Sequence, residues 1–220
     1  QFALVFQPQI SVKEGRIVAA EALLRWRHPN GEIKLPGTFI KRAEETGMIV
    51  EIGDWVVATI ADTIARWGRI GIEQRLAINI SARQLDHADF FRRLREAMKD
   101  ADAPASLLEL EITETLAMHC SEEVIEALSQ FRDDGATISI DDFGTGYSNL
   151  ARLRDLPVDR VKLDRSLIEH IATRSQARAI VHAVIGLIHG LGCEAVAEGI
   201  ETEAQSEVLR IIGCDVIQGY

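Results

Sequence analysis

Carboxylate, amide and ammonium side chains recur along this chain between apolar neighbours. Isoleucine flanks Asn79 on both sides, leucine and isoleucine flank Glu111, and isoleucine precedes Asp141. Lys162 and Glu198 occupy comparable positions further along the chain. Carboxylates inside a protein are costly unless they are paired with a cation or bound to a metal. An oxygen-rich set of this kind is typical of Mg²⁺ or Mn²⁺ sites, so divalent-metal chemistry is the first expectation.

Other kinds of site are poorly represented. The three cysteines, Cys120, Cys193 and Cys214, form no CxxC pair, and the histidines show no HxH or HExxH spacing. A disulfide framework is therefore not expected, and a reducing, cytoplasmic setting is favoured. The net charge of −10 is opposite to that of a general nucleic-acid binder. No DNA or RNA polymer is expected as a partner, whereas one nucleotide could bind if a metal neutralised its charge.

The elements that must position these residues begin with two strands, at 4–10 and 17–25. Their six-residue link contains Glu14 and Gly15 and is too short for a crossover helix, so the strands should form an antiparallel hairpin. The chain then alternates between helices and strands. Helices are predicted at 36–46, 52–67, 86–101, 121–133, with Ser121 as N-cap, 176–191 and 203–212. Further strands are predicted at 75–80, 107–112, 136–141, 160–163, 193–197 and 215–218.

About eight strands with helices between them predict an α/β fold with a parallel sheet. A closed (β/α) barrel is favoured, departing from the standard form in its antiparallel first strand, and a doubly wound open sheet is the alternative. Alternation alone would indicate an antiparallel sheet with one wet face. Because the helices must cover the apolar face, the polar face should point into the barrel. The polar residues then lie near the carboxyl ends of the strands, which is the catalytic face of such barrels.

No linker or low-complexity tract divides the 220 residues, so a single domain covering 1–220 is expected. Eight short motifs occur in order along it: FQP at 6–8, AEALLRWR at 20–27, INIS at 78–81, EITE at 111–114, DDFGTGYSNL at 141–150, VKLDRS at 161–166, AEGIET at 197–202 and QGY at 218–220. Each motif alone is weak. In this order and spacing the chain resembles an EAL domain, a bacterial family that hydrolyses cyclic di-GMP. The resemblance implies a modified TIM (β/α)8 barrel with an antiparallel first strand.

The resemblance carries the family's metal ligands onto matching positions. It implies that Glu21, Asn79, Glu111 and Asp141 hold a first metal. It also implies that Asp142 joins Asp141 at a second metal, with Asp141 bridging the two ions. Neighbours in a strand face opposite ways, so a backbone turn would be needed for both aspartates to face the site. Two Mg²⁺ or Mn²⁺ ions are expected, and the larger Ca²⁺ is expected to bind and inhibit.

Other matching positions resemble residues that surround the reacting water and the substrate. Glu198 would meet the metal-bound water or a metal, and is counted as both catalytic residue and ligand, as is Glu21. Lys162 would orient the water and offset the carboxylate charge. The residues expected at the substrate are Arg25, at a phosphate, Gln218, in the metal-water shell, and Gln7 and Asp164, at the nucleotide.

The segment 141–150 resembles a regulatory loop of the family. Glu114 would anchor this loop, and Gly144 and Gly146 would give it backbone angles that other residues avoid. In the family the loop connects the metal site to the dimer interface, so a homodimer is implied.

The activity implied by the resemblance is hydrolysis of one phosphodiester bond of cyclic di-GMP, giving linear pGpG. The alternatives are a catalytically silent cyclic di-GMP receptor and a barrel enzyme acting on another phosphate ester. The enzyme is favoured because every expected ligand position is filled. The chain reads as a fragment of a longer cytoplasmic signalling protein, with an attached sensor or GGDEF-type domain and a possible tether to the inner membrane. Such a protein would regulate biofilm formation or motility.

Overall fold

The computed structural model describes residues 1–146 and 149–219. Tyr147 and Ser148 of the 141–150 segment, and Tyr220 of the final motif, lie outside the described residues. Among the described ranges, no helix combines the length and apolar character needed to cross a membrane.

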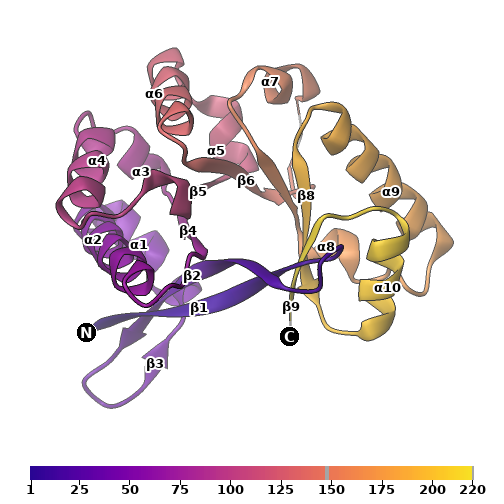
Figure 1. Ribbon diagram of the computed structural model, residues 1–220, viewed down its shortest axis with the longest axis horizontal. Helices are drawn as coiled ribbons and strands as arrows, with labels where there is room; N and C mark the ends of the chain where they lie inside the picture. Colours follow the sequence, from indigo (N-terminus) through magenta and orange to yellow (C-terminus); the bar gives the residue numbers. More distant parts are fainter. Residues whose placement is uncertain (147–148, 220) are drawn as a thin grey trace.

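Eight strands close into a barrel, and the predicted fold class is confirmed (Figure 1). The first strand, β1, pairs antiparallel with both β2 and β9, whereas every other neighbouring pair in the barrel is parallel. This double pairing of β1 excludes an open sheet. The strands are β1 (Phe2–Ser11), β2 (Ile17–Arg27), β4 (Arg75–Asn79), β5 (Leu108–Thr113), β6 (Thr137–Phe143), β7 (Arg160–Leu163), β8 (Glu194–Ile200) and β9 (Val216–Gly219), and the two-residue β3 (Ile33–Lys34) extends the edge of β2.

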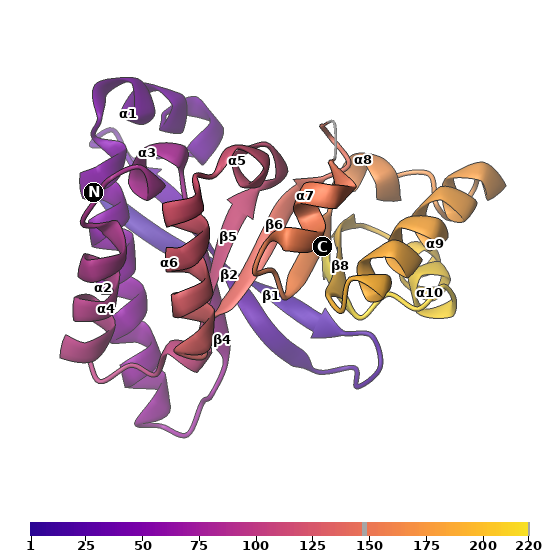
Figure 2. The same cartoon turned by 90° about the horizontal axis from the view of Figure 1, so that it is seen from above.

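Helices surround the barrel on most sides. In Figure 1 they form an arc from α1, α2 and α4 over α6 and α7 to α9 and α10, and β1 to β3 occupy the remaining side. Figure 2 shows the turn of the β1–β2 hairpin projecting away from these helices. The helices are α1 (Ile40–Thr46), α2 (Ile49–Gly68), α3 (Ala82–Leu85), α4 (Phe90–Asp100), α5 (Glu114–His119), α6 (Glu122–Asp133), α7 (Leu150–Asp155), α8 (Arg165–Ile168), α9 (Ser175–Gly190) and α10 (Glu203–Ile211), with 3-10 turns at Pro36–Thr38 and Ala105–Leu107.

The two strand pairings made by β1, with β2 and with β9, differ greatly in length. The β1–β2 register runs from Phe2 opposite Trp26 to Ile10 opposite Ile17, around a turn in which Gly15 has a φ of 64°. The β1–β9 ladder holds two residue pairs, and Ser11 opposite Val216 is the last of them. Side chains inside the barrel must therefore supply much of the contact that closes it.

Most predicted helices and strands are present, with shifted ends. The helix predicted at 86–101 was wrong in its start, because a capping box between Ser81 and Gln84 opens the separate short helix α3 and α4 begins only at Phe90. The predicted cap of α6 is confirmed, since the Ser121 hydroxyl accepts a hydrogen bond from the Val124 backbone N–H at 3.4 Å. The short helices α3, α5, α7 and α8 were not predicted.

The strands separate an apolar outer layer from a polar interior, as their alternation predicted. Outward side chains such as Ile78, Leu110 and Ile138 are buried beneath the helices, at 0–1% exposure. The inward side chains are equally buried but polar: Gln9, Glu109, Glu111, Ser139, Arg160 and Lys162 have exposures of 0–1%. Polar groups buried this deeply need partners, so the barrel interior must contain a hydrogen-bonded network.

Candidate active site

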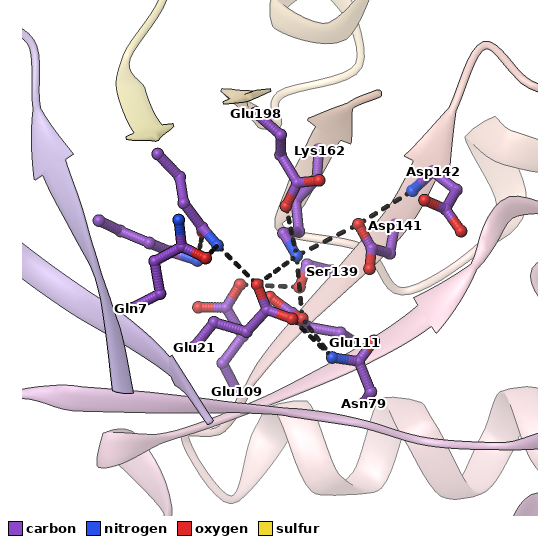
Figure 3. A network of polar contacts seen from close by, with 12 residues as sticks. Gln7, Glu21, Asn79, Glu109, Glu111, Ser139, Asp141, Asp142, Lys162 and Glu198 are labelled. Atoms are coloured by element: carbon purple, nitrogen blue, oxygen red, sulfur yellow. Dashed lines mark hydrogen bonds and ion pairs between the residues drawn. The ribbon is translucent and has the colours of Figure 1, made fainter. Parts of the chain in front are cut away.

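Lys162 lies at the centre of a carboxylate cluster at the carboxyl end of the barrel (Figure 3). Its ammonium reaches carboxylates that come from four different strands. The Nζ–O distances are 2.8 Å to Glu198, 2.9 Å to Glu111, 3.2 Å to Asp141 and 3.5 Å to Glu21. The sequence placed all of these residues except Glu21 at or near strand ends, and the barrel brings them together with Glu21.

The cluster is not neutral, because four carboxylates share one lysine. Burial would lower the pKa of Lys162, but the carboxylates around it raise that pKa well above its usual value. Burial raises the pKa of Glu111 well above the ordinary range, against the opposing effect of Lys162. Burial likewise raises the pKa of Glu198 to about 7. The site therefore holds more acid than its own cation can balance.

Glu21 is held from both sides by amide groups. Its Oε1 accepts from Asn79 Nδ2 at 2.7 Å, and its Oε2 accepts from Gln218 Nε2 at 2.6 Å. Burial acts to raise the pKa of Glu21, but Lys162 and these two amides together lower it. Gln218 can come this close because Gly219 follows it, where a Cβ would collide with the backbone of β8. Glu21 is thus kept ionised and fixed in orientation.

The backbone between the neighbouring residues Asp141 and Asp142 departs from regular strand geometry. Asp142 has a φ of 57°, in the left-handed region that non-glycine residues rarely enter, and the β6–β7 register shifts between Ile140 and Phe143. The Asp142 N–H donates to Asp141 Oδ1 at 2.9 Å. This is the backbone turn that the sequence required at Asp141 and Asp142. Strain of about 1–3 kcal/mol at a residue of this kind is typical of functional sites.

The donor set fits a divalent cation. Glu21, Glu111 and Asp141 each offer an oxygen, and these oxygens lie within 4.8 Å of one another. Glu111 Oε1 is buried and has no hydrogen-bond partner among the described residues. Asn79 turns its Nδ2 toward Glu21 and lies 3.3 Å from Glu111 Oε2, so it would have to rotate its amide to offer an oxygen. An acceptor without a donor beside two more carboxylates is the arrangement that a metal ion satisfies.

A second charged cluster, missed by the sequence analysis, lies below the first. Arg160 Nη1 donates to Glu109 Oε2 at 2.6 Å, Ser139 donates to Glu109 Oε1 at 2.7 Å, and Arg160 Nε lies 3.2 Å from Glu194. Arg75 Nε lies 3.5 Å from Glu109. Two arginines face two glutamates here, so this cluster is balanced and needs no ion. Alternation marked these positions as inward-facing and polar, but it could not show which of them pair.

The residues expected in the regulatory loop also lie near one another. Glu114 Oε2 accepts from the Gly144 N–H at 3.0 Å. Gly144 has a φ of 103°, and a Cβ there would lie 2.5 Å from Leu167 Cδ1, so it must be glycine. Gly146 does not have a left-handed φ, and a Cβ there would make ordinary contacts, so the expectation of an unusual backbone angle is supported at Gly144 and stays a prediction at Gly146. A left-handed angle also occurs at Asp142.

Of the residues expected at the substrate, Gln218 lies inside the barrel beside Glu21, and the other three lie nearer the surface. Gln7 lies opposite Glu21 in the hairpin register, and its Nε2 donates to the Gly219 carbonyl at 3.4 Å. Arg25 is half-buried and donates to the carbonyl of Leu24 at 2.9 Å. The Asp164 carboxylate caps α8 by accepting from the Ser166 N–H at 2.9 Å. Asp164 is thus engaged in local structure. Burial raises the pKa of Asp142 most, and the negative charges of Asp141 and then Asp164 raise it further.

An apolar groove opens beside Asn79, between β2 and the helices α1 and α2. Its volume is about 420 Å³, and its lining includes Leu23, Leu24, Pro36 and Ile40. One acidic residue, Glu44, also lines it. The next residue, Glu45, is exposed and pairs with Arg42 at 3.1 Å. The groove was not predicted, because its residues lie on separate elements that only the fold brings together.

A family model for the EAL domain matches residues 1–220. The chain belongs to the EAL domain family. The resemblance read from the eight motifs is therefore confirmed.

Curated relatives of this EAL domain include Signaling protein YkoW of Bacillus subtilis, 40% identical over 220 residues. Another is a cyclic di-GMP phosphodiesterase of Pseudomonas aeruginosa, 41% identical over 219 residues. Both matches cover 100% of this chain, but 28% of the first relative and 37% of the second. The chain thus spans about a third of the length of these relatives.

The EAL domain is also similar to solved structures. The PaMucR phosphodiesterase in complex with c-di-GMP superimposes with a TM-score of 0.94 and 41% sequence identity. That match covers 100% of this chain and 89% of the solved chain.

Proposed function

We propose that this EAL domain hydrolyses cyclic di-GMP to linear pGpG in a reaction that depends on divalent metal ions. The observation that carries the proposal is the unbalanced cluster, in which four carboxylates converge on Lys162 and one buried oxygen of Glu111 has no donor among the described residues. The similarity to a cyclic di-GMP phosphodiesterase, and to a phosphodiesterase structure bound to c-di-GMP, supports the choice of substrate.

Two Mg²⁺ or Mn²⁺ ions would be held by the inward-facing oxygens. Glu21, Asn79, Glu111 and Asp141 would hold the first, and Asp141 with Asp142 the second, Glu198 lying beside them. When bound, such ions supply positive charge at the phosphate and hydroxide near neutral pH. Ca²⁺ is larger and accepts looser geometry, so it should bind without supporting turnover.

The chain's own residues would position the reactants and move the proton. Glu198, whose pKa is raised to about 7 by burial, can accept the proton of the attacking water near neutral pH. Lys162 holds Glu198 Oε1 at 2.8 Å and fixes its orientation. Arg25 would contact the phosphate, Gln7 and Gln218 would border the reacting water and substrate, and Asp164 would touch the nucleotide. Attack of the water oxygen at phosphorus would form a new P–O bond and break one P–O3′ bond, and the departing 3′ oxygen would take up a proton from solvent.

The groove beside Asn79 would receive one guanine base. Its apolar walls suit a flat ring, and its volume of about 420 Å³ accommodates a purine. The Watson–Crick edge of guanine donates two hydrogen bonds, from N1 and N2, which suits the carboxylate of Glu44. The groove therefore supports a purine nucleotide over other phosphate esters.

A silent receptor is the alternative, and one experiment separates the two. The metal-free protein is incubated with cyclic di-GMP and Mg²⁺, Mn²⁺ or Ca²⁺ in turn, and the products are separated by chromatography. An enzyme is expected to yield pGpG with Mg²⁺ or with Mn²⁺, but not with Ca²⁺ and not without metal. Retention of intact cyclic di-GMP under every condition would indicate a receptor.

Site variants test the assignment of the ligands. Glu21→Ala and Asp141→Asn should abolish turnover and retain the fold, whereas Asp133→Asn, on the exposed end of α6, should leave turnover unchanged. Near-normal turnover by metal-loaded Glu21→Ala would overturn the site.

The wider setting belongs to the same proposal. The domain would form a homodimer near the 141–150 segment and belong to a longer cytoplasmic signalling protein, attached to a sensor or GGDEF-type domain. That protein could be tethered to the inner membrane and would control biofilm formation or motility. A bifunctional relative named MucR, a diguanylate cyclase and cyclic di-GMP phosphodiesterase, supports such an arrangement.

A further inference from the structure

A chain of hydrogen bonds crosses the barrel interior from the lower charged cluster to Glu21. Arg160 Nη1 donates to Gln9 Oε1 at 2.8 Å, and Gln9 Nε2 donates to Gln218 Oε1 at 3.0 Å. Gln218 Nε2 then donates to Glu21 Oε2 at 2.6 Å. The two glutamines come from opposite ends of the chain, and both are at least 95% buried, with exposures of 0% and 5%.

The two ends of this chain determine the direction of every bond in it. The guanidinium of Arg160 can only donate, so Gln9 must turn its oxygen toward it. The amide nitrogen of Gln9 then faces Gln218, whose amide oxygen must accept the hydrogen bond. Gln218 is left with its NH₂ toward Glu21, whose ionised carboxylate can only accept. We call this series of hydrogen bonds, from Arg160 through Gln9 and Gln218 to Glu21, the relay. Each amide in the relay has one orientation that satisfies both neighbours.

Gln7 provides independent support for the same direction. Its Nε2 donates to the Gly219 carbonyl, which can only accept, at 3.4 Å. Its Oε1 therefore faces Gln218 and accepts from Gln218 Nε2 at 3.3 Å. Both hydrogens of the Gln218 amide are thus engaged, one by Gln7 and one by Glu21. A reversed Gln218 amide would set its oxygen against two acceptors.

We propose that Gln9 is a positioning residue for the metal ligand Glu21. Anchored by Arg160, it fixes the amide of Gln218 so that an N–H donor always faces Glu21 Oε2. The inference rests on the proposed function, because it gives Glu21 the role of a metal ligand. Gln9 itself touches neither the carboxylate cluster nor the rim in any described contact, so its effect must pass through Gln218. Partners that orient a ligand from behind usually change metal affinity or activity about 10- to 100-fold.

Two substitutions at this position separate the relay from simple packing. Gln9→Glu keeps the shape and an acceptor for Arg160, but it removes the donor to Gln218. Gln218 must then turn its NH₂ toward the new carboxylate and its oxygen toward Glu21. Gln9→Met removes both contacts, yet leaves Gln218 free to keep donating to Glu21.

The experiment measures Mn²⁺ affinity by calorimetry and the melting temperature of the metal-free protein, for the wild type and both variants. The relay predicts that Gln9→Glu binds Mn²⁺ about 10- to 100-fold more weakly, whereas Gln9→Met loses less than about tenfold. For stability it predicts the reverse order, with Gln9→Met the less stable variant, because that substitution removes one of the two acceptors of the buried Arg160 Nη1. If Gln9 only fills space, Gln9→Met is the weaker variant in both measurements. Simple charge attraction predicts tighter Mn²⁺ binding by Gln9→Glu.

The outcomes distinguish the inference from the function on which it rests. A wild type that neither binds Mn²⁺ nor cleaves cyclic di-GMP would refute the proposed function and the relay's role together. A wild type that does both, beside a Gln9→Glu protein with unchanged Mn²⁺ affinity, would refute the relay alone. If Gln9→Glu fails to fold, neutron diffraction of the deuterated wild type decides: amide deuterons of Gln218 directed at Glu21 support the relay, and an oxygen there overturns it.

Discussion

Replacing Lys162 with methionine should destabilise the metal-free protein severely. The lysine is fully buried and lies within 3.5 Å of four carboxylates, and methionine preserves most of its length without its charge. Removing one partner from a buried ion pair costs about 3–5 kcal/mol, because the other charge is left uncompensated. For a protein of this size each kcal/mol corresponds to about 2–4 °C in melting temperature, so a fall of roughly 6–20 °C is expected.

The loss should depend on both pH and metal. Without Lys162, the carboxylates around it would bind protons more tightly in the folded than in the unfolded protein. Stability then falls as the pH rises, so the variant should be weakest above about pH 7. Divalent ions supply the missing positive charge, and Mn²⁺ at about 100 times its Kd contributes about 2.7 kcal/mol. Mn²⁺ should therefore raise the melting temperature of Lys162→Met by more than that of the wild type.

Thermal unfolding by circular dichroism at pH 8, with EDTA or with Mn²⁺, tests this expectation. Lys41→Met, at an exposed position of α1, is the matched control and should melt like the wild type in both buffers. A Lys162→Met protein that melts within 2 °C or so of the wild type in EDTA would refute the reasoning about charge imbalance. A Mn²⁺-induced rise no larger than that of the wild type would refute the claim that metal replaces the lysine's charge.

Three further expectations concern the cluster, the groove and the loop. Metal binding should weaken below about pH 7, because Glu198, with a pKa of about 7, must be ionised to bind the ion. The affinity should fall by about tenfold per pH unit for each proton displaced. A metal affinity that calorimetry finds constant from pH 5 to 8 would contradict this. Glu44→Ala should raise KM about 10- to 100-fold through loss of a charged hydrogen bond to the base. Glu45→Ala should leave KM unchanged. Equal increases in KM for the two variants would show that the base does not bind in the groove. Gly144→Ala should lower kcat while sparing Mn²⁺ affinity, since its Cβ would lie 2.5 Å from Leu167 Cδ1; an unchanged kcat would separate the loop from the reaction.

The barrel could be predicted because its signals are local and repeated. A short link with Glu14 and Gly15 fixes the hairpin, and the alternation of apolar and polar residues assigns the faces of each strand. The helices that were missed have a few residues each, too short for a helical period to show. They begin instead at single capping side chains, such as Thr113 before α5 and Asp164 before α8.

The candidate site was predictable in its membership but not in its connections. Inward-facing acids could be recognised one strand at a time, whereas the partner of Gln9 lies 151 residues away at Arg160. The left-handed backbone fell on Asp142, a residue type that tolerates this conformation better than most but usually avoids it, whereas Gly146 does not adopt it. Pairing and backbone strain depend on which strands become neighbours, and composition does not carry that information.

The short pairing between β1 and β9 has a consequence for how the protein is made. The glutamine that holds the second oxygen of Glu21 follows it by 197 residues, so Glu21 leaves the ribosome well before this partner. Until β9 arrives to pair with β1, the barrel is open and Glu21 lacks that donor. Metal competence should therefore appear late and abruptly during synthesis, when the last strand completes the barrel and the ligand shell in a single step.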